Sequence, residues 1–154
     1  MGARIERILV PVDFSPCSDS ALSYATSLAQ KLGAAVDVLH VWEPPARLEP
    51  WQPAEFDRFM QGSLDEHRTE LERLVGPLRE EGIPMRHKVV ADTAVPGIVH
   101  EADTGNYDLI VLGTHGRTGL RRVLLGSVAE AVVRHARCPV LTVQTGHAAR
   151  TRAA

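Results

Sequence analysis

The sequence predicts a single α/β domain in which a five-stranded parallel sheet is covered by helices on both faces. Apolar runs rich in β-branched residues alternate along the chain with segments whose apolar residues recur at helical spacing. Such alternation favours a parallel sheet with right-handed crossover connections. The length of 154 residues fits one domain over residues 1–145 and leaves a short tail, 146–154, that we expect to be disordered.

Five segments have the composition of buried strands. Residues 8–12 and 109–112 are continuous apolar runs that end abruptly in polar or glycine-containing loops. Strands that helices cover on both faces have this composition, because neither face meets water. Three weaker candidates complete the predicted sheet, at 36–41, 86–90 and 140–143.

Helical spacing predicts four helices between these strands, over residues 21–32, 56–78, 95–102 and 128–136. Pro16 suits the first turn of the first helix, and Gly33 is its expected end. Gly76 and Pro77 should kink or shorten the second helix. The proline-rich segment 43–53 fits neither period and is predicted to be a surface loop.

Composition excludes several classes of function. Lys and Arg total 17 and Asp and Glu total 19, so the net charge of −2 argues against a general basic surface for nucleic acid. No apolar run approaches the ~20 residues of a membrane helix, and the N-terminus lacks the layout of a signal peptide. Cys17 and Cys138 are too few for a disulfide framework, and the seven histidines are scattered. We therefore expect a cytoplasmic domain with free thiols and no metal site built by the protein itself.

Two strand ends stand out as a candidate ligand site. The first strand runs into Asp13 and Ser15, and the fourth runs into a glycine-rich loop over residues 113–119. In open parallel sheets, ligands bind beyond the carboxyl ends of the strands, where the strand order reverses. Glycines expose backbone N–H groups, and the helix N-terminus that follows Gly126 adds partial positive charge. Five arginines and one acid lie within 113–137, which favours an anionic ligand such as a phosphate.

A purely structural interpretation of the same residues stays open. Ser127 and Glu130 have the spacing of a capping box, and Gly126 would then only permit the turn. Arg134 and Arg137 suit a helix C-terminus for electrostatic reasons alone. The loop matches neither the P-loop nor the G-x-G-x-x-G pattern, which argues against a standard nucleotide hydrolase or dinucleotide dehydrogenase.

The spaced motif Gly113-x2-Gly116-x9-Gly126-Ser127 resembles the nucleotide-binding signature of the universal stress protein family, in its ATP-binding branch. Residues 8–15 resemble the first strand of that family, and residues 134–143 resemble its last helix and strand. The resemblance spans 7–143 and is weakest within the region from Pro44 to Gly62.

This resemblance implies the strand order 3-2-1-4-5 and a site for ATP, with Mg²⁺ held through the phosphates. It also implies a homodimer paired through 140–143, since an open apolar edge strand would favour aggregation. Carried over by position, the residues at adenine and ribose would be Pro11, Val12, Asp13 and Val41. The residues around the phosphates would be Gly113, His115, Gly116 and Arg117, and the site would be closed by Gly126, Ser127 and Val128.

The expected function is nucleotide-dependent sensing or regulation in a stress response, in which a regulatory protein partner reads the surface ordered by ATP. A slow ATPase is one alternative, in which Asp13 would orient the attacking water. A nucleotide-free dimeric adaptor is a second, in which the glycines and Ser127 serve only turns and caps. A different nucleotide in the same pocket, such as cyclic AMP, is a third. No G-x-S-x-G motif is present, and no catalytic residue is assigned.

Overall fold

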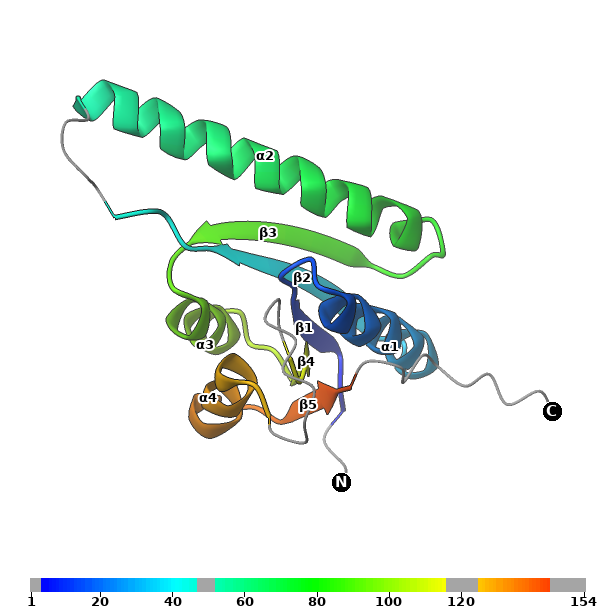
Figure 1. Cartoon of the computed structure of the whole chain (residues 1–154). Coiled ribbons are helices and arrows are strands. Elements are labelled where there is room, and N and C mark those ends of the chain that lie inside the picture. Colours follow the sequence, from blue (N-terminus) through cyan, green and yellow to red (C-terminus); the bar gives the residue numbers. More distant parts are fainter. Residues whose placement is uncertain (1–3, 47–51, 116–124, 145–154) are drawn as a thin grey trace.

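Five parallel strands form one sheet in the order β3-β2-β1-β4-β5, which confirms the expected topology (Figure 1). A computed structural model describes residues 4–46, 52–115 and 125–144. Every predicted strand is present and differs from its predicted bounds by at most one residue at either end. The strands are β1 (Arg7–Pro11), β2 (Ala35–Trp42), β3 (Met85–Ala91), β4 (Leu109–Gly113) and β5 (Val140–Val143).

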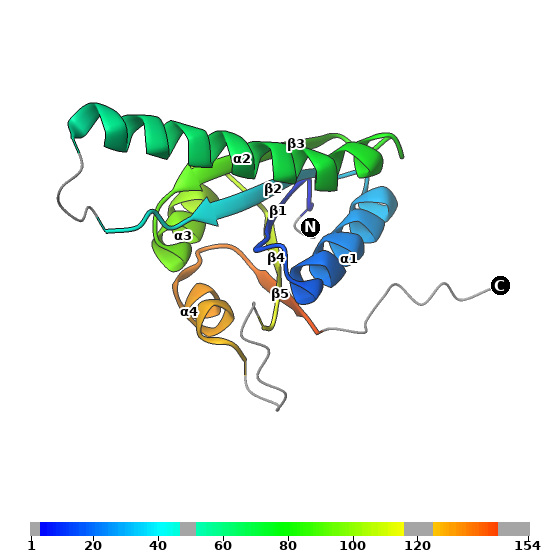
Figure 2. The same ribbon diagram turned by 45° about the horizontal axis from the view of Figure 1, so that its top comes forward.

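Helices cover both faces of the sheet (Figures 1 and 2). The helices are α1 (Pro16–Leu32), α2 (Pro53–Arg79), α3 (Ala94–Thr104) and α4 (Ser127–His135). Helices α1 and α2 pack on one face, and α3 and α4 pack on the other. No helix in the described ranges is long and apolar enough to cross a membrane.

Strand β1 shows why its sequence lacks an apolar–polar alternation. Ile8 and Val10 face α1 and α2, whereas Leu9 faces α3 and α4. All three side chains are at most 1% exposed, so both faces of this strand are buried. On the first face the helices contribute Leu71 and Val75, which are fully buried. The continuous apolar run therefore reflects helices on both sides, as predicted.

Helix α1 has the ends that its sequence predicts. The Ser15 hydroxyl accepts a hydrogen bond from the backbone N–H of Ser18 at 3.2 Å, and Pro16 occupies the first helical position. Gly33 follows the helix with φ +67°, in the left-handed region that glycine adopts without steric cost.

Helix α2 differs from its prediction at both ends. It begins at Pro53, which belongs to the first turn and not to the preceding loop. It continues through Gly76 and Pro77 to Arg79, so the predicted shortening at these residues is wrong. Pro77 stands in the last turn, where the loss of one backbone N–H donor affects little of the helix.

Candidate functional site

The loop between β1 and α1 is fixed by short-range hydrogen bonds. The Asp13 carboxylate accepts the backbone N–H of Ser15 at 3.0 Å, and the backbone N–H of Asp13 donates to the Ser18 hydroxyl at 3.4 Å. Phe14 between them has φ +61°, a conformation that L-residues seldom adopt. The loop therefore turns sharply at Phe14 and keeps Asp13 at the carboxyl end of β1.

A buried histidine on the neighbouring strand β2 stabilises this loop. His40 on β2 is 4% exposed, and its Nδ1–H donates to the backbone carbonyl of Val12 at 2.8 Å. Its ring contacts Phe14 with centroids 4.5 Å apart and stacks on His67 of α2 at 5.0 Å. No local pattern predicts this role, because a histidine within an apolar strand carries no sequence signal of its partners.

The end of β4 lies directly against the first turn of α1. A Cβ atom on Gly113 would come within 2.8 Å of the Cys17 sulfur and 2.9 Å of the Cys17 carbonyl oxygen. The Cys17 thiol also lies 3.5 Å from the backbone carbonyl of Val143 on β5. Gly113 thus permits a close approach that brings the end of β4 beside the loop holding Asp13.

Thr114 after β4 and Gly126 before α4 are in direct contact. The backbone N–H of Gly126 donates to the Thr114 carbonyl at 2.7 Å, and a Cβ on Gly126 would also lie 2.7 Å from that oxygen. Residues 115 and 125 are therefore anchored next to each other. Of the predicted site residues in between, Gly116 and Arg117 lie outside the residues that the structure describes.

Helix α4 begins differently from the predicted capping box. Gly126 is the N-cap, and Ser127 is the first residue of the helix, so Ser127 does not cap it. The Glu130 carboxylate does not reach back to the N-terminus but pairs with Arg134 at 2.8 Å, one turn further along the helix. The expected capping box is therefore wrong, because the turn starts one residue earlier. The first N–H groups of α4, from Ser127 onward, have no intrahelical acceptors, and Gly126 just before them lies against Thr114.

His115 presents a buried nitrogen at this position. Its Nδ1 lies 2.9 Å from the Thr114 hydroxyl. Its Nε2 is buried, and within the described ranges it has no hydrogen-bond partner. Buried polar atoms are nearly always paired, so this nitrogen is available to a partner beyond the described residues.

The structure gathers most of the predicted site residues at one edge of the sheet. The ends of β1 and β4 are adjacent in the strand order, and α4 begins against Thr114. Val41 lies one strand further out, near the end of β2, where it contacts α3. A Cβ on Gly97 would come within 2.9 Å of its side chain. No group of three or more His, Cys, Asp or Glu side chains in the described part of the chain is placed to hold a metal ion.

An open parallel sheet in this strand order defines a doubly wound α/β protein whose topological switch point lies between β1 and β4. The chain belongs to the universal stress protein family, whose model matches residues 4–144. Universal stress protein MJ0531 of Methanocaldococcus jannaschii is 31% identical over 139 residues, which cover 90% of this chain and 82% of that protein.

Solved structures agree with this assignment. Universal stress protein UspA from Lactobacillus plantarum superimposes with a TM-score of 0.79 and 26% identity, covering 92% of this chain and 99% of that one. MJ0577 of Methanocaldococcus jannaschii gives a TM-score of 0.78 and 29% identity, covering 92% and 97%. The predicted family and fold are therefore confirmed.

Proposed function

We propose that this universal stress protein binds ATP at the carboxyl ends of β1 and β4 and acts as a nucleotide-dependent regulator. The observation that carries the proposal is the buried Nε2 of His115, which has no partner in the described residues. His115 itself lies beside the start of α4, since a Cβ on Gly126 would be 3.5 Å from its Cα. A donor nitrogen next to free helix N–H groups suits a phosphate oxygen. Asp13, fixed at the neighbouring strand end, suits a ribose hydroxyl or the adenine amino group.

The proposal assigns the two halves of the nucleotide to two sets of residues. Adenine and ribose would contact Pro11, Val12, Asp13 and Val41. The phosphates would contact Gly113, His115, Gly116 and Arg117, with Gly126, Ser127 and Val128 closing the site and Mg²⁺ held through the phosphates. Gly113 also packs closely against Cys17. A Gly113 variant could therefore lose nucleotide affinity through destabilisation alone.

The ligand class agrees with two proteins of the same fold. One universal stress protein was solved in complex with cAMP and another, from Archaeoglobus fulgidus, in complex with dAMP. Their identities to this chain are 23% and 24%, so the similarity by itself shows a shared fold and no more. Both ligands contain adenine, which is the base that we assign to the pocket around Val12 and Val41.

The proposal includes the assembly and setting of the protein. Strand β5 lies at the edge of the sheet, and a homodimer through Val140–Val143 would pair its open backbone groups. The free thiols Cys17 and Cys138 fit a reducing, cytoplasmic location. Nucleotide binding would order the loops after β1 and β4, and a regulatory protein would bind the ordered surface.

Calorimetric titration with Mg-ATP tests the proposal, after the purified protein has been checked for bound nucleotide. We expect saturable binding that weakens about tenfold in His115→Ala, since one buried hydrogen bond to an anionic group is lost. His100→Ala is the matched control, because His100 is exposed on α3 and is not among the predicted site residues. A flat titration on folded, nucleotide-free protein would refute the proposal and favour the adaptor.

Two further measurements separate the remaining alternatives. Competition between ATP and cyclic AMP in one titration identifies the preferred nucleotide. Steady release of ADP that stops in Asp13→Ala, while the fold survives, would make the protein a slow ATPase on the same site. Release that is undetectable over hours would leave ATP as a regulatory ligand.

A further inference from the structure

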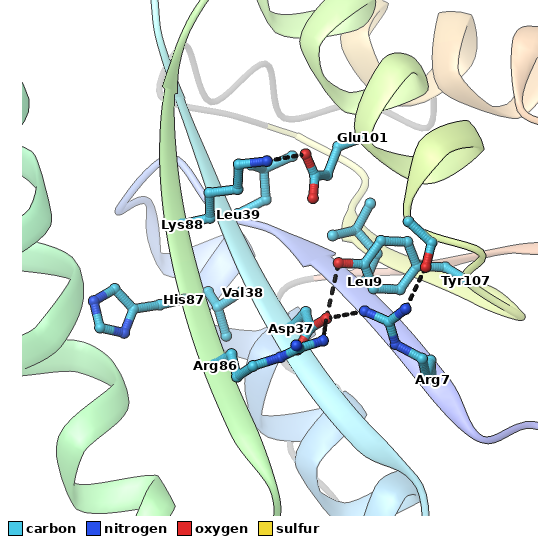
Figure 3. A pocket seen from close by; sticks show the side chains of 11 residues that line it. Arg7, Leu9, Asp37, Val38, Leu39, Arg86, His87, Lys88, Glu101 and Tyr107 are labelled. Carbon is cyan, nitrogen blue, oxygen red and sulfur yellow. Dashed lines mark hydrogen bonds and ion pairs between the residues drawn. The ribbon is translucent and has the colours of Figure 1, made fainter.

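A groove lies on the side of the sheet that α3 and α4 cover, between α3 and the edge strand β3 (Figure 3). It has a volume of about 310 Å³, at the lower limit for small-molecule sites. Leu9 and Leu39 line its floor, and Arg86 and Lys88 project from β3 along its outer side. The groove exists because β3 is the last strand on this side, so its polar side chains on this face stay exposed.

Asp37 lies at the centre of the groove and organises the charges around it. It is only 8% exposed, and its carboxylate accepts hydrogen bonds from Arg7 at 2.6 Å and from Tyr107 at 2.8 Å. Arg86 donates to both carboxylate oxygens, at 3.0 and 2.7 Å. Three of these donors converge on Oδ2, and only Nε of Arg86 reaches Oδ1. Asp37 therefore positions two guanidinium groups on this side of the sheet.

The charges in the groove add up to a single positive charge. Burial by itself would raise the pKa of Asp37, but the hydrogen bonds from Arg86, Arg7 and Tyr107 together lower it below 3.8. The carboxylate is therefore ionised at neutral pH and neutralises one of the two arginines. Lys88 pairs with Glu101 at 2.7 Å, which adds no net charge.

Arg86 retains N–H donors for a ligand, because 71% of its side chain is exposed. A guanidinium has five N–H donors, and Arg86 commits Nε and Nη2 to Asp37. Its Nη1 makes no hydrogen bond to any residue in the described ranges. Asp37 holds the plane of this guanidinium, so a ligand meets donors whose orientation is already set.

We propose that this groove binds a small organic monocarboxylate, with its carboxylate on the Arg86 guanidinium and its apolar part over Leu9 and Leu39. One negative charge matches the single positive charge of the groove. A phosphate group carries more negative charge and would lie close to Asp37 and Glu101, which repel it. The planar guanidinium also matches the planar carboxylate.

The proposal is independent of the nucleotide site. Arg7 and Asp37 lie at the amino-terminal ends of β1 and β2, whereas Asp13 follows the carboxyl end of β1. The test therefore uses the full chain without nucleotide. Sodium benzoate is titrated at constant ionic strength while the backbone amide shifts are followed by NMR. We expect saturable shifts confined to residues around 37–39 and 86–88.

Two matched variants decide the result. Arg86→Gln removes the donor and should weaken benzoate binding at least about tenfold, since a charged hydrogen bond is lost. Arg68→Gln removes an exposed arginine that also pairs with a carboxylate, Asp65 at 2.8 Å, but lies on α2 outside the groove. The Arg68→Gln protein should bind benzoate with the affinity of the wild type.

Three outcomes overturn the proposal. Benzoate shifts that do not saturate, or that map elsewhere, show that the groove is not a site for carboxylates. Equal weakening in Arg86→Gln and Arg68→Gln shows a general charge effect. Tighter binding of inorganic phosphate than of benzoate in the same titration contradicts the argument from charge. Benzoate binding that survives saturation with Mg-ATP supports a site separate from that of the nucleotide.

Discussion

Replacing Gly113 with alanine tests the close contact between the end of β4 and the start of α1. The added methyl carbon would lie 2.8 Å from the Cys17 sulfur, 2.9 Å from the Cys17 carbonyl oxygen and 3.0 Å from its carbonyl carbon. Two of these three atoms belong to the backbone, so no change of side-chain rotamer relieves the overlap. Overpacking of this kind costs about 1–3 kcal/mol in the free energy of unfolding. A loss of about 2 kcal/mol would lower Tm by roughly 4–8 °C in a chain of this size.

Gly62→Ala is the matched control for this prediction. Gly62 is an exposed residue within α2, and a Cβ there would meet nothing within 4 Å. The same substitution should stabilise the protein by about 0.5–1 kcal/mol, because alanine favours a helix interior. The two glycine-to-alanine changes are thus expected to have opposite signs, which urea unfolding followed by circular dichroism will measure.

A second variant separates the side-chain part of the overlap from the backbone part. Cys17→Ala removes the sulfur but leaves the carbonyl group in place. We therefore expect Gly113→Ala in the Cys17→Ala background to keep most of its cost. Full recovery in the double variant would show that only the sulfur opposes the methyl group. A Gly113→Ala protein as stable as the wild type would refute the reasoning about the contact altogether.

Three other predictions concern stability. Leu71→Ala should lower the free energy of unfolding by about 2–5 kcal/mol, since this side chain of α2 is fully buried. A urea midpoint close to that of the wild type would contradict this and show that the core collapses around the gap. Gly33→Ala should cost about 1 kcal/mol because φ is +67° there, and Gly33→Asn should cost less; equal costs would contradict this cause. The pKa of Asp37 is lowered, so its carboxylate stabilises the fold above its unfolded pKa, and this contribution fades as pH falls below 3.8. The destabilisation caused by Asp37→Asn should therefore be larger at pH 7 than at pH 3, and a pH-independent difference in urea midpoints would contradict it.

Local patterns predicted the elements, and non-local contacts account for what they missed. The strands and helices were recovered because each has its own apolar period and its own end signals, such as Pro16 and Gly33 around α1. The order of the strands came from the family resemblance. The shortening predicted at Pro77 is wrong because a proline in the last turn of a helix has the same sequence signal as one in the middle.

For the candidate site too, local patterns carry a signal and contacts between distant residues do not. Glycines and polar residues at two strand ends predict a ligand site at the carboxyl ends of β1 and β4, and this stays a prediction. Asp37 gave no signal, because its partners Arg7, Arg86 and Tyr107 stand 30, 49 and 70 residues away in the sequence. His40, whose carbonyl acceptor lies 28 residues earlier, was missed for the same reason.

The contact between Thr114 and Gly126 has a consequence for how this fold can diversify. Both groups of this hydrogen bond belong to the backbone, so it holds the start of α4 against the end of β4 whatever side chain stands at position 114. Substitutions of the Thr114 side chain can therefore accumulate while the start of α4 stays in place, and the chemistry beside it can change without repacking of the sheet.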